Sequence, residues 1–197
     1  HIIDQQVDEY YMEGLKLYSN AQWQEAIQIW EQVLKLNKRF DPAILGIESA
    51  RAQINMFENI KNKLGFGLMR LPMTNNEVDI EQTSKMVDLF IESGFNYFDT
   101  AHVYIDGKSE TAIRDCLSAR YNREDFVLAD KLSIWLYEKE EEILPHFEQQ
   151  LKLCGVDYFD FYLFHALNRN SYKKHKSCNT FEIVKQLKRE GRVKHIA

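Results

Sequence analysis

Residues 94–110 read GFNYFDTAHVYIDGKSE, and this stretch decides how the second half of the chain is interpreted. It opens with a glycine, continues as an apolar and aromatic run over 95–101, and reaches Ser109 and Glu110. Serine is a common helix N-cap, and glutamate is favoured in a first helical turn. The stretch therefore predicts a buried strand over 95–101, a loop, and a helix over 109–120.

The same alternation extends to both sides of this stretch. Helices are predicted at 80–93, 138–154 and 181–189, and buried strands at 64–72, 126–132, 158–165 and 193–197. Near-continuous apolar strands separated by helices are typical of a parallel sheet. We therefore expect an α/β fold, a partial (β/α)8 TIM barrel with about four βα units and the start of a fifth strand. A whole barrel needs about 250 residues, so we expect a fragment that holds half of one.

The first 61 residues have a wholly helical pattern instead. Apolar residues recur at helical spacing over 11–18 and over 26–34, and the residues between these faces can turn the chain. This predicts a helical hairpin, in which the small Gly14 and Ala26 let two backbones approach. We expect a helical domain over 1–61 and a barrel domain over 62–197.

The segment from Glu9 to Asn37 resembles a tetratricopeptide repeat. A second register begins at Ala43, about 34 residues later, and fades, so 44–60 is expected to be a capping helix. The resemblance implies a docking surface for a protein partner, and the alternative is a stabilising appendage. The match rests on Gly14, Tyr18, Trp23, Ala26, Ile27, Leu34 and Leu36.

Composition and charge argue against several classes of protein. The chain has 25 Lys and Arg against 30 Asp and Glu, a net charge of -5, whereas nucleic-acid binders are usually basic. No run approaches the roughly 18 apolar residues of a membrane span. Cys116, Cys154 and Cys178 form no CxxC pair, so we expect no metal site and no disulfide framework. Free thiols favour a reducing compartment, and we expect a cytoplasmic protein.

Polar residues stand at the ends of otherwise apolar strands. Asp99, Lys131 and His165 each lie near the carboxyl end of a predicted strand, and Tyr104 lies in the loop after the first of them. Such groups are costly to bury unless they are paired. Catalytic residues of (β/α) barrels gather at this end of the strands. The four residues therefore predict one shared site.

The segments that carry these residues closely resemble the aldo/keto reductase family. Residues 94–104 and 107–110 match its main signature, 128–131 its lysine strand, and 162–165 its histidine strand. The resemblance covers about 64–197. It implies an oxidoreductase that reduces a small carbonyl substrate with NADPH, or alternatively with NADH.

The resemblance also implies a role for each residue. Tyr104 would be the general acid that protonates the carbonyl oxygen. Lys131 would be a cation that favours the charged form of the phenol, and Asp99 would pair with that cation. His165 would bind and orient the substrate carbonyl.

For the cofactor, the family places Gly67, Met69 and Asp99 near the nicotinamide, although a tight barrel turn would also use a glycine. The family holds the cofactor's phosphates on loops after strands seven and eight, which the expected half barrel does not include. We therefore expect this chain to bind NADPH weakly and to have little activity alone.

Three alternatives to this interpretation stay open. Asp99 and Lys131 could be a structural ion pair, the chain could be a scaffold with a silent barrel remnant, or it could be another (β/α) barrel enzyme with a metal or phosphate ligand in this position.

Overall fold

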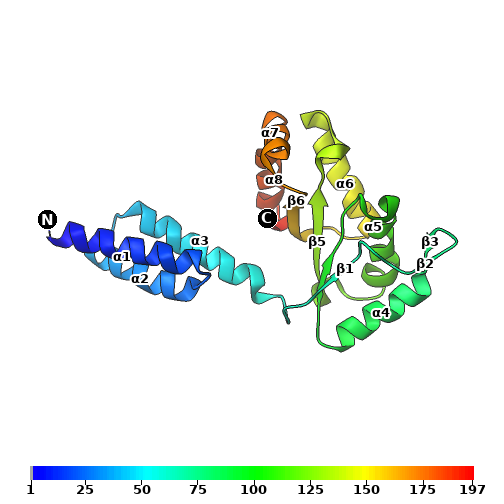
Figure 1. The fold of residues 1–197 in the computed structure, drawn as a ribbon, viewed down its shortest axis with the longest axis horizontal. Helices are drawn as coiled ribbons and strands as arrows, with labels where there is room; N and C mark the ends of the chain where they lie inside the picture. The colour runs from blue at the N-terminus through cyan, green and yellow to red at the C-terminus, as the bar shows by residue number, and fades with distance from the viewer. Residues whose placement is uncertain (1) are drawn as a thin grey trace. The chain divides into compact units, whose positions relative to one another are not determined.

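The computed structural model describes residues 2–197, which divide into two compact units between Asn59 and Ile60. No helix among these residues combines the length and the apolar character needed to cross a bilayer. The first unit contains three helices, α1 (Ile2–Ser19), α2 (Trp23–Leu36) and α3 (Asp41–Glu58), and α2 contacts both of the others. Figure 1 shows α1 and α2 side by side.

The core of the first unit is built around Trp30, which is 1% exposed. A Cβ added at Gly14 would lie 2.2 Å from the indole Nε1, and one added at Gly46 would lie 2.8 Å from the ring. The indole nitrogen donates a hydrogen bond to the carbonyl of Tyr11 at 3.2 Å. Gly14 is therefore needed to make room for a side chain, and not for the close approach of two backbones that the sequence suggested.

The second unit contains a five-stranded sheet in the order β1-β4-β5-β6-β7, and every neighbouring pair is parallel. This confirms the predicted α/β fold with a parallel sheet, the arrangement found in part of a (β/α)8 barrel. The register places Gly67 opposite Asp99, and Asp99 opposite Ala129. The strands are β1 (Gly65–Gly67), β4 (Tyr97–Asp99), β5 (Val127–Leu132), β6 (Phe159–Phe164) and β7 (Val193–Ile196).

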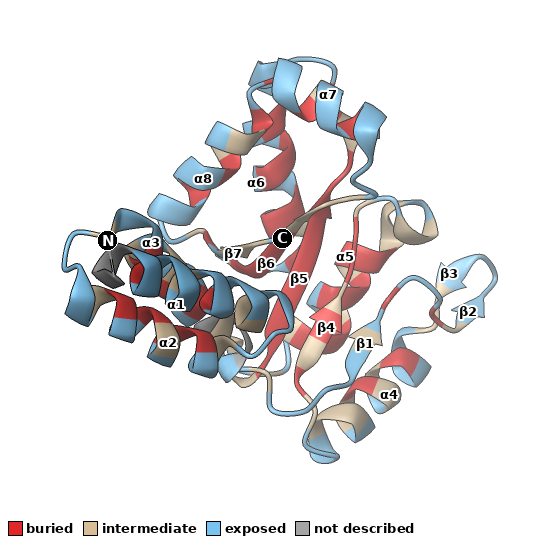
Figure 2. Ribbon diagram, turned by 60° about the vertical axis from the view of Figure 1, so that its left-hand side comes forward, coloured by how far each residue is buried: buried red, intermediate tan, exposed pale blue. Residues whose placement is uncertain are grey.

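Helices follow the strands and bury the core against the sheet. Phe98 of β4, Leu128 of β5 and Phe147 of α6 are fully buried in one cluster. Figure 2 shows the buried residues along β5 and on one side of the helices. The helices are α4 (Ile80–Glu92), α5 (Lys108–Ile113), α6 (Ile143–Cys154), α7 (Arg169–Ser177) and α8 (Thr180–Arg189).

The first predicted strand is much shorter than expected. Only 65–67 of the predicted 64–72 is a strand, and a hairpin of β2 (Met73–Thr74) and β3 (Glu77–Val78) follows this segment. Asn75 and Asn76 join the two hairpin strands with φ of 53° and 63°. Asparagine tolerates the left-handed region that tight hairpin turns require.

Two helices also differ from the prediction. The helix expected over 109–120 is α-helical only to Ile113 and continues as a π-helical turn, Arg114–Ser118. The helix expected from 138 begins at Ile143, after a separate 3-10 turn (Glu140–Glu142). Pro145 lies in the first turn of α6, where a backbone N–H has no helical partner, so it does not disturb the helix.

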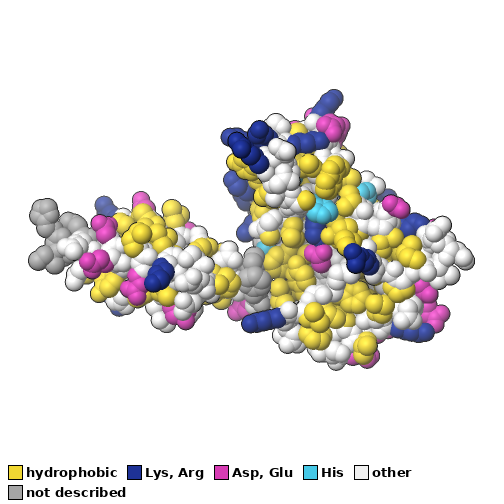
Figure 3. Space-filling view, in the orientation of Figure 1, with side chains coloured by type: hydrophobic (Ala, Val, Ile, Leu, Met, Phe, Trp, Pro, Cys, Tyr) yellow, Lys and Arg dark blue, Asp and Glu magenta, His cyan; other side chains and the backbone are white. Residues whose placement is uncertain are grey.

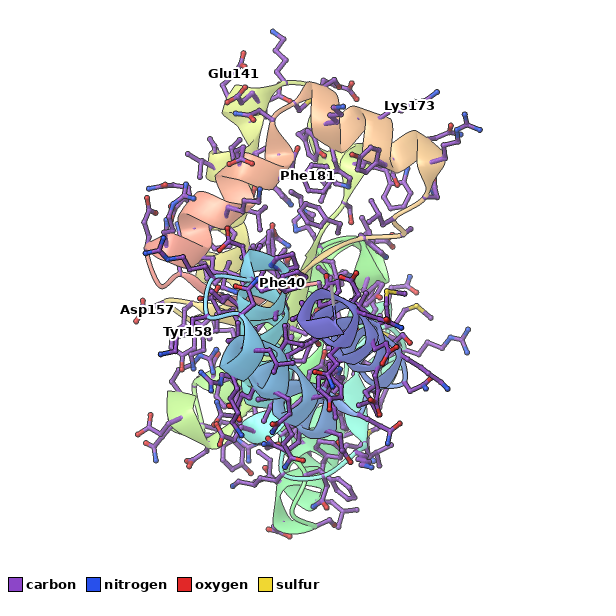
Figure 4. The ribbon with its side chains drawn as sticks, turned by 90° about the vertical axis from the view of Figure 1, so that its left-hand side faces the viewer. Phe40, Glu141, Asp157, Tyr158, Lys173 and Phe181 are labelled. Atoms are coloured by element: carbon purple, nitrogen blue, oxygen red, sulfur yellow. The ribbon has the colours of Figure 1, made fainter. Side chains whose placement is uncertain are left out.

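The basic stretch 173–176 belongs to helix α7. The side chain of Asn168 caps this helix by accepting hydrogen bonds from the backbone N–H groups of Asn170 and Ser171. An asparagine N-cap satisfies donors that a helix start leaves free. In Figure 4, Lys173 lies on α7 and Phe181 lies on α8.

Candidate active site

An ion pair joins the carboxyl ends of β4 and β5. The Lys131 Nζ donates hydrogen bonds to Asp99 Oδ1 at 2.5 Å and to the carbonyl of Thr100 at 2.7 Å. The lysine side chain is 10% exposed and the aspartate 29%, so the pair is largely withdrawn from water. Because a charge is costly to bury without a partner, the two side chains hold each other at the strand ends.

Tyr104 and His165 complete the cluster. The Lys131 Nζ lies 4.8 Å from the centre of the Tyr104 ring. The rings of Tyr104 and His165 are perpendicular, with centroids 5.8 Å apart. The structure therefore brings together all four residues that the sequence placed at one rim. On the face seen in Figure 3, histidine, basic and acidic side chains of the second unit lie close together among hydrophobic ones.

The backbone after Tyr104 has an unusual conformation. Ile105, Asp106 and Gly107 have φ of 51°, 52° and 84°. The left-handed region is rare for a β-branched residue, and such strain persists where the surrounding structure enforces it. Ala166, directly after His165, also has a positive φ of 52°. Sharp local turns thus follow two of the four site residues.

Ser133 holds the imidazole of His165. The serine Oγ and the His165 Nδ1 are 2.6 Å apart, and the exposed Trp135 packs edge-on against the same ring with centroids 5.6 Å apart. Burial, with a smaller contribution from Lys131, lowers the pKa of His165, which favours the neutral ring. With Nδ1 engaged, Nε2 is the nitrogen left to bind a ligand. Ser133 was not predicted from the sequence, although it lies two residues after the lysine.

Gly67 and Met69 lie on exposed backbone at the end of β1. Gly67 pairs with Asp99 in the sheet, and a Cβ added to it would have no heavy atom within 4 Å. Met69 is 48% exposed. The surface beside Asp99 is therefore open at Gly67, so a flat ring could approach the backbone there.

A buried polar cluster lies behind the lysine and was also missed. Glu110, Asp130 and Gln150 are fully buried. Gln150 Nε2 donates to Glu110 Oε1 and to the carbonyl of Lys131, each at 3.1 Å. His102 Nδ1 lies 2.7 Å from the other oxygen of Glu110, and this hydrogen bond raises the pKa of His102. An aspartate inside the apolar strand 127–132 was the available signal. Within residues 2–197, no group of three or more His, Cys, Asp and Glu side chains is arranged to hold a metal ion.

The fold and the cluster define an α/β barrel-type domain with a candidate proton-transfer site at its strand ends. Residues 63–197 match the aldo/keto reductase family, and the chain belongs to that family. This agrees with the resemblance seen in the sequence. The match does not extend to the helices α1–α3, so their likeness to a tetratricopeptide repeat stays a prediction.

Curated relatives match parts of the second unit. The chain is 34% identical over 106 residues to human aldo-keto reductase family 1 member C3. This match covers 52% of the chain and 31% of the human protein. It is 40% identical over 63 residues to the aryl-alcohol dehydrogenase [NADP(+)] of Phanerodontia chrysosporium, covering 32% of this chain and 16% of that enzyme. The chain therefore matches less than half the length of these relatives.

Solved structures show the same fold. An aldo-keto reductase from Bacillus halodurans in its holo form superposes with a TM-score of 0.56 at 28% identity, over 68% of this chain and 45% of that one. An aldo-keto reductase from Klebsiella pneumoniae in complex with NADPH superposes with a TM-score of 0.51 at 21% identity, over 68% and 43% of the two chains. The second likeness bears on the fold alone.

Proposed function

We propose that residues 60–197 supply the proton-donating and substrate-orienting side chains of a carbonyl reductase that uses NADPH, with NADH as the alternative cofactor. The observation that carries this proposal is the convergence of Asp99, Tyr104, Lys131 and His165 at the carboxyl ends of β4, β5 and β6. The family match favours an enzyme over a scaffold with a silent barrel remnant.

Tyr104 is the general acid in this proposal. Its hydroxyl gives a proton to the carbonyl oxygen as negative charge develops there, and a positioned acid of this kind contributes roughly 10²- to 10⁴-fold in rate. The Lys131 ammonium, 4.8 Å from the ring centre, stabilises the phenolate that remains. Asp99 and the carbonyl of Thr100 fix the position of that ammonium.

His165 binds and orients the substrate in this proposal. A neutral imidazole with Nδ1 held by Ser133 presents Nε2 to a carbonyl oxygen. When this nitrogen carries the proton, it donates a hydrogen bond that directs the oxygen toward Tyr104. The perpendicular packing of the two rings supports this shared approach to one atom.

The residues at the end of β1 fit a nicotinamide ring. Gly67 leaves the backbone beside Asp99 open, and a side chain at this position would fill that space. A bound reduced nicotinamide supplies the hydride that protein side chains cannot deliver. Gly67, Met69 and Asp99 would contact the cofactor, while the strand ends hold the proton donor on the substrate's side.

The test uses the full-length protein with NADPH and a panel of small aldehydes and ketones. We expect oxidation of NADPH that depends on the carbonyl compound and falls at least 100-fold in Tyr104→Phe. Tyr97→Phe is the matched control, because burial raises the pKa of Tyr97 to about 12 and the proposal gives that phenol no role. Activity that survives Tyr104→Phe would exclude the proposed acid.

Cellular location and partners are part of the same proposal. Cys116, Cys154 and Cys178 are free and buried, which supports a reducing compartment such as the cytoplasm. The substrate class is a small carbonyl compound. A protein partner bound through α1–α3 stays a prediction.

A further inference from the structure

Strand β5 extends beyond the end of its neighbour β4. The last ladder bond between them runs from the N–H of Thr100 to the carbonyl of Ala129 at 2.9 Å. Backbone groups in a strand alternate between its two edges, so the N–H and C=O of Lys131 point to the same edge, past the end of β4. Unpaired backbone groups are costly to bury, and Lys131 is 8% exposed.

At Lys131, side chains form the backbone hydrogen bonds that a neighbouring strand would otherwise form. The N–H of Lys131 donates to Asp130 Oδ1 at 2.7 Å, and its carbonyl accepts from Gln150 Nε2 at 3.1 Å. Gln150 also donates to Glu110, and the Tyr162 hydroxyl donates to Gln150 Oε1 at 2.6 Å. The backbone of Lys131 is therefore fixed at both polar groups by buried side chains.

Two of these side chains are carboxyls in contact with each other. Glu110 and Asp130 are both 0% exposed and lie within hydrogen-bonding reach. The ammonium of Lys131 is bonded to Asp99 and not to either of them. Two ionised carboxylates repel each other strongly in a site that excludes water. With one proton between them, the protonated carboxyl donates a hydrogen bond to the ionised one. Burial first, and then the charge of Glu110, raises the pKa of Asp130 well above its ordinary value.

We propose that Glu110 and Asp130 share one proton and that this pair, together with Gln150, forms a positioning network for Lys131. The shared proton is independent of the proposed reductase function. The positioning role rests on that function, because it concerns the lysine beside Tyr104. Within the network, the hydroxyl of protonated Asp130 donates to Glu110, whose two oxygens also face Gln150 and His102.

Three titratable groups around the Glu110–Asp130 pair stay neutral, so the shared proton stays on the pair. Burial raises the pKa of Cys154, whose Sγ lies 3.8 Å from Asp130 Oδ2, and the pKa of Tyr162, so both stay neutral. Burial lowers the pKa of His146 to about 4. His102, whose side chain is 23% exposed, packs on His146 and connects Glu110 to the surface.

Infrared spectroscopy tests the shared proton without any activity. At pH 7 the full chain should show the carbonyl band of a protonated carboxyl, and Asp130→Asn should lose it. Asp160→Asn is the matched control, because Asp160 is 4% exposed but pairs with Arg123 at 2.6 Å and Lys194 at 2.9 Å. That variant should lose a carboxylate band instead. Loss of only a carboxylate band in Asp130→Asn overturns the proposal.

A second measurement on the wild-type protein covers the case in which a variant fails to fold. The side-chain ¹³C carboxyl resonances of labelled aspartates and glutamates, followed from pH 4 to pH 8, should include a buried carboxyl that remains protonated throughout. If every aspartate and glutamate titrates at the acid end of this range or below it, the shared proton is excluded.

The positioning role is tested by rescue. Asp130→Ala removes the acceptor for the Lys131 N–H and should lower kcat about tenfold to a hundredfold with the KM for NADPH unchanged. Asp130→Asn keeps that acceptor and a donor to Glu110, so it should restore kcat. Amide hydrogen exchange at Lys131 should rise in Asp130→Ala and not in the control Asp160→Ala.

These readouts separate the two proposals from each other. An inactive full-length wild-type protein would count against the reductase function, while the infrared and exchange measurements would still decide the network. An active wild-type protein with unchanged kcat and unchanged exchange in Asp130→Ala would refute the positioning role alone.

Discussion

The ammonium of Lys131 lies 4.8 Å from the centre of the Tyr104 ring, while its hydrogen bonds go to Asp99 and the carbonyl of Thr100. The cation is thus held by β4 and the loop that follows it, and the ring packs near a charge that is already in place. A cation near an aromatic ring contributes about 0.5–2 kcal/mol, so this contact does not depend on the hydroxyl. Position and acidity of the phenol can therefore be separated by mutation.

Tyr104→Phe should keep the fold and lose the chemistry. The phenylalanine ring retains the packing against Lys131 and His165, so we expect the unfolding temperature to change little. Turnover with a carbonyl substrate should fall by about 10²-fold or more. Thermal unfolding followed by circular dichroism and NADPH oxidation together check this prediction. A large loss of stability would show that the hydroxyl has a structural role.

Ser133→Ala should weaken substrate binding through His165. Without the serine hydroxyl, the 2.6 Å hydrogen bond to Nδ1 is lost. The imidazole can then rotate, so its Nε2 no longer points toward the substrate carbonyl. A hydrogen bond contributes about 1 kcal/mol, so the KM for the carbonyl compound should rise about fivefold. Ser118→Ala removes a hydroxyl bonded to the carbonyl of Cys154 and serves as the control. An equal rise in KM for both variants would contradict this role.

His146 should make the protein sensitive to acid. Burial lowers its pKa to about 4, below the value of about 6.5 in an unfolded chain. Between these two values the unfolded state binds a proton that the folded state does not, so stability falls as the pH drops from 6.5 toward 4. His146→Leu should reduce this fall and remove a buried Nε2 that has no partner. Identical pH slopes of the unfolding temperature in both proteins would refute the assignment.

Gly14→Ala should destabilise the helical unit. The new methyl group would lie 2.2 Å from the Trp30 Nε1, and the buried indole has little room to move. Overpacking of this kind costs about 1–3 kcal/mol. Glu13→Ala, at an exposed position on the same helix, is the control and should have little effect. Chemical denaturation of both variants measures the difference.

The strand ends were predictable from the sequence because the argument depends only on topology. Parallel strands place their carboxyl ends at one edge, so Asp99, Lys131 and His165 had to converge once the alternation of strands and helices was recognised. Family resemblance then supplied the expected role of Tyr104.

The supporting residues could not be predicted in this way. Gln150 is 19 positions from Lys131 and 40 from Glu110, and its hydrogen bonds depend on how α6 packs on the sheet. Ser133 is bound to a residue 32 positions away. The Asn75–Asn76 turn is a local signal, but the hairpin could not be predicted from it because the flanking strands are only two residues long.

The left-handed residues after Tyr104 have a consequence for engineering the protein. Ile105 holds a φ of 51° that glycine or asparagine adopts far more easily. Replacing it would release conformational strain without changing the phenol or the ion pair of Lys131 and Asp99. A search for more thermostable variants should therefore begin one residue beyond the proposed proton donor.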